Sequence, residues 1–368
     1  MKIFLFSYEL KTSMYTWSHF HYIDELQKVG HTIIKFNPCD YSSFDEANEV
    51  VLKIIRKTPG IDIFITCNNQ DIIYKETIEQ LKRIGIPTCL ICWDNLELPY
   101  KQKQIAPLFD FVWITSIETK YLFEKWGCKN IIFQTYAANP FCFKPQWEKT
   151  ISAVGFIGSP YGSRVNKINE LIEARIPCEI YSDSLFIEGF NSSIGHKKNI
   201  NIKDLMIKSS RYLRFPIGRK VLYSTLKNKF LIHEKLRRDS ELLRAQRSVS
   251  LNSMIKLYSN FAMSLNITEL RDTYVLKSPI HKIHLRAFEI PMSGGLQFAS
   301  YTDEMDSYFK DNEEIILYKN NEEFVDKARF FLDPHNENII KNIKKAARKR
   351  AENEHTWNVR FNNIFKLL

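Results

Sequence analysis

A glycine-containing run, GFIGSPYGSR at residues 155–164, leaves a predicted strand and enters a predicted helix. Glycine lets a tight turn approach a bound molecule, and the first N–H groups of a helix have no partner within it. Such groups favour phosphate oxygens, to which Arg164 can add a charge-assisted hydrogen bond. The run predicts a diphosphate site at Gly158, Ser159 and Arg164, although an ordinary strand-to-helix turn has the same composition.

A second candidate is HLRAFEIPMSGG at residues 284–295, followed by an apolar run. A single carboxylate, Glu289, placed one turn before the Gly294-Gly295 pair can accept both hydroxyls of a ribose, and Arg286 can offset phosphate charge. The alternative is that Glu289 is a solvated helix carboxylate and the two glycines only end the helix.

A third candidate is Cys92-Trp93-Asp94-Asn95, which ends a predicted strand in the first half of the chain. Asp94 can accept a proton from a substrate hydroxyl, and Asn95 can orient that substrate. The alternative is that Asp94 caps the following turn. His19 lies beyond the first strand and is a further candidate for binding the substrate that carries this hydroxyl, although a histidine on a helix more often serves packing.

No Asp-x-Asp pair follows a strand in the way that a bridging divalent cation would require, so we expect no metal. Seven cysteines are scattered along the chain. Cys89 and Cys92 have the spacing of half a zinc site but lie within one apolar strand, which favours a buried reduced pair. The sequence has no disulfide framework, secretory signal or long apolar run, so we expect a cytoplasmic protein.

The elements that must position these residues alternate between short apolar strands and helices. About six strands precede a connector at residues 136–150, and the same pattern then restarts. Strands without polar alternation are typical of a parallel sheet covered on both faces. The sequence predicts an α/β fold of two Rossmann-like domains, 1–145 and 146–355, with a cleft between them. We expect helices over 281–295 and about 336–353, and a last helix at 356–368 that packs back on the first domain.

Residues 196–256 carry 16 Lys/Arg against 4 Asp/Glu. Their apolar residues, Val221 to Leu243, recur at spacings of four and seven, which predicts an amphipathic helix within an insertion at about 190–250. One interpretation is a solvated insertion that packs on a partner. The other is docking on an anionic membrane through cations such as Arg237, Arg238, Arg244 and Arg247. No nucleic-acid-binding module accompanies the charge, so we expect no nucleic acid partner.

The segment RAFEIPMSGG at 286–295 resembles the core of the group 1 glycosyltransferase domain of CgeB-like, spore-maturation-type proteins. The resemblance continues through Tyr308-Phe309, Glu313-Glu314-Ile315 and Glu322-Glu323-Phe324 to EHTWNVR at 354–360. It is strongest over about 250–360, with weaker likeness in Tyr136 to Pro140 and Phe156 to Gly158.

That resemblance implies a GT-B fold and metal-independent transfer of a sugar from a UDP- or GDP-linked donor to a glycan, lipid-linked or protein acceptor. The donor would bind the second domain and the acceptor the first. Related retaining enzymes use two glutamates with seven residues between them. Glu289 matches the second glutamate, whereas His281 occupies the place of the first. Ile283, His284 and Leu285 align with backbone that approaches the diphosphate.

Two other functions stay open, and the histidine at position 281 favours the first of them. One is an inactive GT-B scaffold that binds lipid or a protein partner, and the other is a nucleotide-sugar epimerase. For an active enzyme, the resemblance implies a role in cell-surface polysaccharide synthesis, in the cytoplasm or on the inner face of the membrane.

Overall fold

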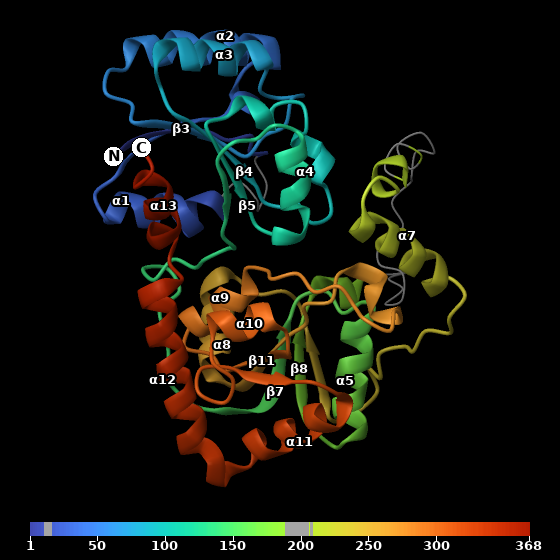
Figure 1. The fold of residues 1–368 in the computed structure, drawn as a ribbon. Coiled ribbons are helices and arrows are strands. Elements are labelled where there is room, and N and C mark those ends of the chain that lie inside the picture. Colours follow the sequence, from blue (N-terminus) through green and yellow to red (C-terminus); the bar gives the residue numbers. More distant parts are fainter. Residues whose placement is uncertain (11–16, 188–205, 207–208) are drawn as a thin grey trace. The chain divides into compact units, whose positions relative to one another are not determined.

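The computed structural model describes residues 1–10, 17–187, 206 and 209–368 (Figure 1). The chain divides into two compact units. The first comprises Met1–Cys142 and His355–Leu368, and the second comprises Phe143–Glu354. In the described chain no helix is both long and apolar enough to cross a membrane.

The first unit contains a six-stranded parallel sheet in the order β2-β1-β3-β4-β5-β6. Strands β3, β4 and β5 are buried along their whole length, because helices cover both faces of the sheet. The strands are β1 (Lys2–Phe6), β2 (Thr32–Phe36), β3 (Ile63–Thr66), β4 (Thr88–Cys92), β5 (Phe111–Ile114) and β6 (Ile131–Phe133).

The helices of this unit are α1 (Asp24–Lys28), α2 (Phe44–Lys57), α3 (Lys75–Ile84), α4 (Lys120–Lys125) and α13 (Trp357–Phe365). Helices α2 and α3 cover one face of the sheet, and α1 and α13 lie together on the other (Figure 1). Ser43 caps α2 by accepting the N–H of Glu46 at 3.1 Å, and Gly85 ends α3 with a φ of 84°.

Helix α13 is fixed to the first unit by a buried carboxylate. Glu25, in α1, accepts the backbone N–H groups of Trp357 at 3.3 Å and Asn358 at 2.6 Å. These are first-turn donors that have no partner within α13. Burial raises the pKa of the Glu25 carboxyl from 4.5 to about 7, and the two backbone hydrogen bonds oppose this rise.

The raised pKa of Glu25 makes stability depend on pH. The folded state binds the proton more tightly than the unfolded chain does, so the stabilisation is complete below pH ~4.5 and is lost as the pH rises to about 7. This loss is about 3 kcal/mol at most. We expect Glu25→Gln to remove this part of the pH dependence, measured as the difference in unfolding free energy between pH 5 and pH 8. Glu118→Gln, at an exposed position, is the control and should leave the difference unchanged. An unaltered difference in Glu25→Gln would contradict the prediction.

The second unit also has a six-stranded parallel sheet, in the order β12-β11-β10-β7-β8-β9. The chain passes from β7 outward to β8 and β9, and then returns to β10 on the other side of β7. Ligands of such sheets bind beyond the carboxyl ends of the strands at this reversal. The strands are β7 (Ile151–Ile157), β8 (Cys178–Tyr181), β9 (Leu243–Gln246), β10 (Phe261–Asn266), β11 (Gln297–Ser300) and β12 (Ile316–Tyr318).

Helices surround this sheet and bury its apolar side chains, among them Val154, Ile180, Met263 and Phe298. Gly155 permits the close approach of β7 to β10, because a Cβ there would lie 2.2 Å from the ring of Phe261. The helices are α5 (Ser163–Glu173), α7 (Pro216–Asn228), α8 (Leu251–Asn260), α9 (Arg286–Met292), α10 (Asp303–Tyr308), α11 (Asn321–Leu332) and α12 (Glu337–Glu354).

Two of the predicted helices are wrong in extent. The helix expected over 281–295 forms only over Arg286–Met292, because His281 instead makes an antiparallel bridge with Glu269. The basic amphipathic helix ends at Asn228, and Leu243 belongs to β9, which pairs with β8. Leu236 and Leu243 are buried in the core of the second unit, so they are not on the apolar face of a surface helix. Residues 190–205, 207 and 208 of the predicted insertion lie outside the described residues.

Candidate functional site

Two arginines converge at the carboxyl end of β7. The guanidinium carbons of Arg164 and Arg286 lie 5.8 and 5.7 Å from the ring centroid of Phe156, and Arg164 also stacks on Tyr161 at 4.4 Å. Neither arginine forms an ion pair with a carboxylate in the described chain. The structure therefore brings together two sequence-predicted residues that are 122 positions apart, at the reversal of the sheet.

Gly158 makes room for this pair. Its φ is +142°, and a Cβ at this position would lie 2.4 Å from Nη2 of Arg286. On the same turn, Nη1 of Arg164 donates to the backbone oxygen of Ser159 at 2.9 Å. Helix α5 begins at Ser163, and its N-cap Gly162 offers no side-chain acceptor to the first N–H groups. The first N–H groups of α5 and the Arg164 guanidinium belong to the turn between β7 and α5, and the Arg286 guanidinium lies beside that turn.

The electrostatics of this turn favour an anion. Burial, together with the positive charge of Arg286, lowers the pKa of Arg164 to about 10, and the charges of Tyr161 and Glu269 oppose this change. Two partly desolvated cations close together repel each other, and a bound phosphate group would offset this repulsion. The turn can therefore hold a phosphate or diphosphate.

Glu289 is buried rather than solvated, with an exposed fraction of 8%. It lies on α9 near Tyr258, a buried tyrosine of α8. Burial raises the pKa of Tyr258, the charge of Glu289 raises it further, and the charge of Arg286 lowers it. The structure thus places Glu289 in the same neighbourhood as Arg286 and excludes the solvated-carboxylate interpretation, while its contact with a ribose stays a prediction.

His281 lies beside Glu269, a residue that the sequence analysis missed. Thr268 Oγ1 and His281 Nδ1 are 2.8 Å apart. Burial lowers the pKa of the His281 imidazole, and the negative charge of Glu269 partly offsets this effect. Oε2 of Glu269 is buried without a hydrogen-bond partner in the described chain. Glu269 follows β10 at the reversal of the sheet, and this position after a buried strand is the signal that could have identified it.

The remaining predicted donor residues lie around α9. Ile283 is buried, and His284 and Leu285 are half-buried immediately before the helix. Gly294 has a φ of +72°, and its carbonyl accepts the indole N–H of Trp147 at 2.8 Å. Gly295 lies against the backbone of Tyr258. The two glycines end α9 and pack against other protein groups, which agrees with the alternative interpretation. Their contact with a donor stays a prediction.

In the first unit the predicted acceptor residues differ in their surroundings. Asp94 and His19 are exposed, and the Asp94 carbonyl begins a turn. Asn95 is 1% exposed, and its amide donates to Ser116 and Thr119 and accepts the N–H of Thr115. The hydrogen-bonding groups of Asn95 hold together the loop after β5, which favours a structural role, and its assignment to acceptor binding stays a prediction. Asp94 and His19 stay predictions.

Among the described residues no three His, Cys, Asp or Glu side chains are grouped in a way that could hold a metal ion. Cys89 and Cys92 are buried free thiols in β4, as expected from their place in an apolar strand. The expectation of metal-independent chemistry stays a prediction.

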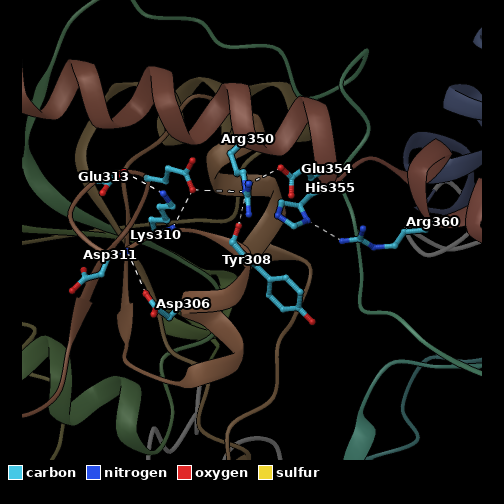
Figure 2. Close-up of polar contacts among 10 residues, drawn as sticks. Asp306, Tyr308, Lys310, Asp311, Glu313, Arg350, Glu354, His355 and Arg360 are labelled. Carbon is cyan, nitrogen blue, oxygen red and sulfur yellow. Dashed lines mark hydrogen bonds and ion pairs between the residues drawn. The ribbon is translucent and has the colours of Figure 1, made fainter.

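Other residues of the family-like motifs form structural contacts (Figure 2). In the second unit, Arg350 donates to the Tyr308 backbone oxygen at 3.2 Å and pairs with Glu354 at 2.5 Å. In the first unit, Nη2 of Arg360 and Nδ1 of His355 are 3.0 Å apart. These contacts join α12 to the end of α10 and stabilise the start of α13, so we assign these residues to the fold and not to the chemistry.

Residues 219–366 match a family model described as glycosyl transferase-like. No curated protein matches the chain.

Several solved structures are similar over the whole chain. Sucrose-phosphate synthase from Thermosynechococcus elongatus has 11% identity and a TM-score of 0.54, covering 100% of this chain and 98% of that one. Anabaena Alr3699/HepE in complex with UDP-glucose has 10% identity and a TM-score of 0.56, with both chains fully covered. An alpha-glucosyltransferase in complex with UDP and a 13-mer DNA has 12% identity and a TM-score of 0.60, covering 100% and 98%.

These likenesses confirm the predicted fold class, an α/β protein of the GT-B type with two Rossmann-like domains. The family model matches residues 219–366 as glycosyl transferase-like, and membership of the whole chain in the group 1 glycosyltransferase family stays a prediction. The CgeB-like subgroup stays a prediction.

Proposed function

We propose that this chain is a glycosyltransferase that takes a sugar from a nucleotide-diphosphate donor bound to its second unit. The observation that carries the proposal is the Arg164–Arg286 pair, which lies beside the Gly158 turn without a carboxylate partner in the described chain. The family match, and relatives crystallised with UDP or UDP-glucose, support a nucleotide-sugar as the anion.

The two guanidinium groups have a direct role in this reaction. As the bond between the sugar and the diphosphate breaks, negative charge grows on the leaving diphosphate oxygen. Fixed cations and backbone N–H groups stabilise that charge more in the transition state than in the ground state, which accelerates the step. We propose that Arg164, Arg286 and the N–H groups of α5 supply this stabilisation without a metal ion.

Other residues have narrower roles in the proposal. Glu289 would accept the ribose hydroxyls, and His281, with Glu269 beside it, would contact the transferred sugar. Asp94 would accept the proton of the acceptor hydroxyl. A UDP- or GDP-linked hexose, a retaining outcome and a glycan, lipid-linked or protein acceptor are the finer parts of the proposal, as is a cytoplasmic or peripheral location.

The test is a thermal-shift screen of the free protein against UDP-glucose, GDP-mannose, CMP-sialic acid and dTDP-glucose, repeated with a chelator. A ligand that binds the folded state raises the melting temperature by mass action. We expect the UDP or GDP compound to raise it with or without chelator, and Glu289→Ala to reduce the rise. No shift with any of the four would overturn the proposal.

Incubation of the binding donor first without and then with acceptors separates the rival functions. An epimerase would convert the sugar while leaving it attached to the nucleotide, and an inactive scaffold would give no turnover with any acceptor. A transferase releases the nucleoside diphosphate only when an acceptor or water takes the sugar.

A further inference from the structure

Helix α7 buries small and polar residues together with Val221, and its inward side makes hydrogen bonds to the protein. Thr225 and Asn228 bind the Asp272 carboxylate at 2.9 and 3.1 Å, and the Tyr274 hydroxyl donates to Asn228 at 2.8 Å. Asp272 and Tyr274 belong to the short 3-10 helix η8 (Arg271–Val275). A surface helix of a soluble protein normally turns its apolar side inward. Hydrogen bonds to η8 therefore hold α7 in an orientation that leaves apolar residues outside.

Those apolar residues form one outward row. Tyr223, Leu226 and Phe230 follow each other at intervals of three and four, which places them on one side of α7 and its C-terminal turn. Phe230 is 88% exposed and Ile232 is fully exposed. Single exposed apolar residues are common, but a contiguous row of large ones marks an interaction surface. We call Tyr223, Leu226, Phe230 and Ile232 the apolar edge of α7.

Cations accompany the apolar edge. Residues 209–232 contain six Lys/Arg and no Asp or Glu. Arg219, Lys220, Lys227 and Lys229 are all exposed on α7 or next to it. Two of these contact only backbone oxygens in the described chain: Arg219 donates to Leu213, and Lys227 donates to Val275. Aromatic and aliphatic side chains flanked by cations match the boundary between the acyl chains and the anionic headgroups of a lipid leaflet.

The four arginines that the sequence predicted to dock on an anionic membrane lie elsewhere on the second unit. Arg237 pairs with Glu173, Arg238 donates to the Leu185 backbone, Arg244 pairs with Glu179 at 3.4 Å, and Arg247 stacks on Phe186 at 5.1 Å. These four side chains are turned back onto the second unit around β8 and β9. They provide a natural set of control positions.

We propose that the apolar edge of α7 inserts into the surface of a membrane that contains anionic lipid, and that Lys220, Lys227 and Lys229 hold the headgroups. The partner is a lipid surface, because exposed apolar side chains and exposed cations occur together along one edge of α7. This proposal does not depend on donor binding, so either one can fail without the other.

The experiment is co-sedimentation of the full chain with vesicles of phosphatidylcholine alone or with about 30% phosphatidylglycerol. We expect binding only to the anionic vesicles. The triple variant Leu226→Ser, Phe230→Ser, Ile232→Ser should lower the partition coefficient about 100-fold. Lys220→Ser with Lys229→Ser should lower it about 10-fold at low salt and less at high salt.

Two matched controls remove similar groups from other surfaces of the second unit. Phe330→Ser with Ile339→Ser removes exposed apolar side chains, and Arg237→Ser with Arg247→Ser removes two cations. Both should retain most of the binding, and the triple variant should keep the wild-type melting temperature. Absence of vesicle binding, equal binding to neutral vesicles, or an equal loss in the controls would overturn the proposal. Absence of vesicle binding would leave a protein partner as the occupant of the edge.

Discussion

Replacing Arg286 by alanine is expected to weaken binding of the nucleotide-sugar about 100-fold, measured by titration calorimetry. Hydrogen bonds to charged groups contribute about 1.5–3 kcal/mol each, and one of the two guanidinium groups at the Gly158 turn would be lost. The free protein should not lose stability, because the change also removes the repulsion that helps to lower the pKa of Arg164. Weaker binding without a lower melting temperature would identify Arg286 as a ligand-binding residue.

Gly158→Ala should act on the same site without removing a charge. The added Cβ would displace the Arg286 guanidinium, so affinity should fall in the same direction. Arg329→Ala removes an exposed arginine of α11 and serves as the control. If Arg286→Ala binds donor as tightly as Arg329→Ala does, the arginine pair is not the donor site.

Replacing Trp357 by alanine should destabilise the first unit by about 3–5 kcal/mol. Its indole is fully buried at the start of α13 and contacts the rings of Tyr22, Trp93 and Trp113 at centroid distances of 5.7, 5.7 and 6.4 Å. Loss of the ring leaves a cavity among groups that cannot close on it fully. Denaturant unfolding monitored by tryptophan fluorescence and circular dichroism measures the change.

Trp126→Ala provides the comparison in the same unit. Trp126 is half-buried at the end of α4 and packs on Tyr100 and Phe123, so its removal should cost less than that of Trp357. Equal effects of the two substitutions would show that α13 does not hold the first unit together in the way that its contacts suggest.

The elements that the sequence predicted well are those with strong local signals. The buried strands of both sheets are short apolar runs, and Gly30 and Gly85 end their helices with positive φ. Strand β9, LRAQ, was not predicted because it has only two apolar residues and Leu243 also fits the spacing of the preceding helix, so that only its pairing with β8 identifies it as a strand. Helix α11 was also missed, although Asn320 caps it by accepting the N–H of Glu323 at 2.9 Å.

Part of the candidate site could be predicted because some of its residues also have strong local signals. Glycine-rich turns and nearby arginines are local features, so Gly158, Arg164 and Arg286 could be identified separately. Their meeting depends on the strand order, which places β7 beside β10 and which no local pattern encodes. The carboxylate of Glu269 could not be assigned to the site without that order. An amide that holds a loop has the same residue type as one that orients a substrate, so the sequence alone could not distinguish these two roles for Asn95.

The first unit has consequences for synthesis, because residues 143–354 separate its two segments in the chain. The ribosome synthesises the N-terminal segment first, but Glu25 and Tyr22 meet Trp357 only more than 300 residues later, and Trp93 meets it more than 260 residues later. The second unit can complete its sheet before that helix emerges, whereas the first cannot bury its aromatic side chains. The nascent chain therefore exposes Tyr22, Trp93 and Trp113 during most of translation, and these are the surfaces on which a chaperone would act.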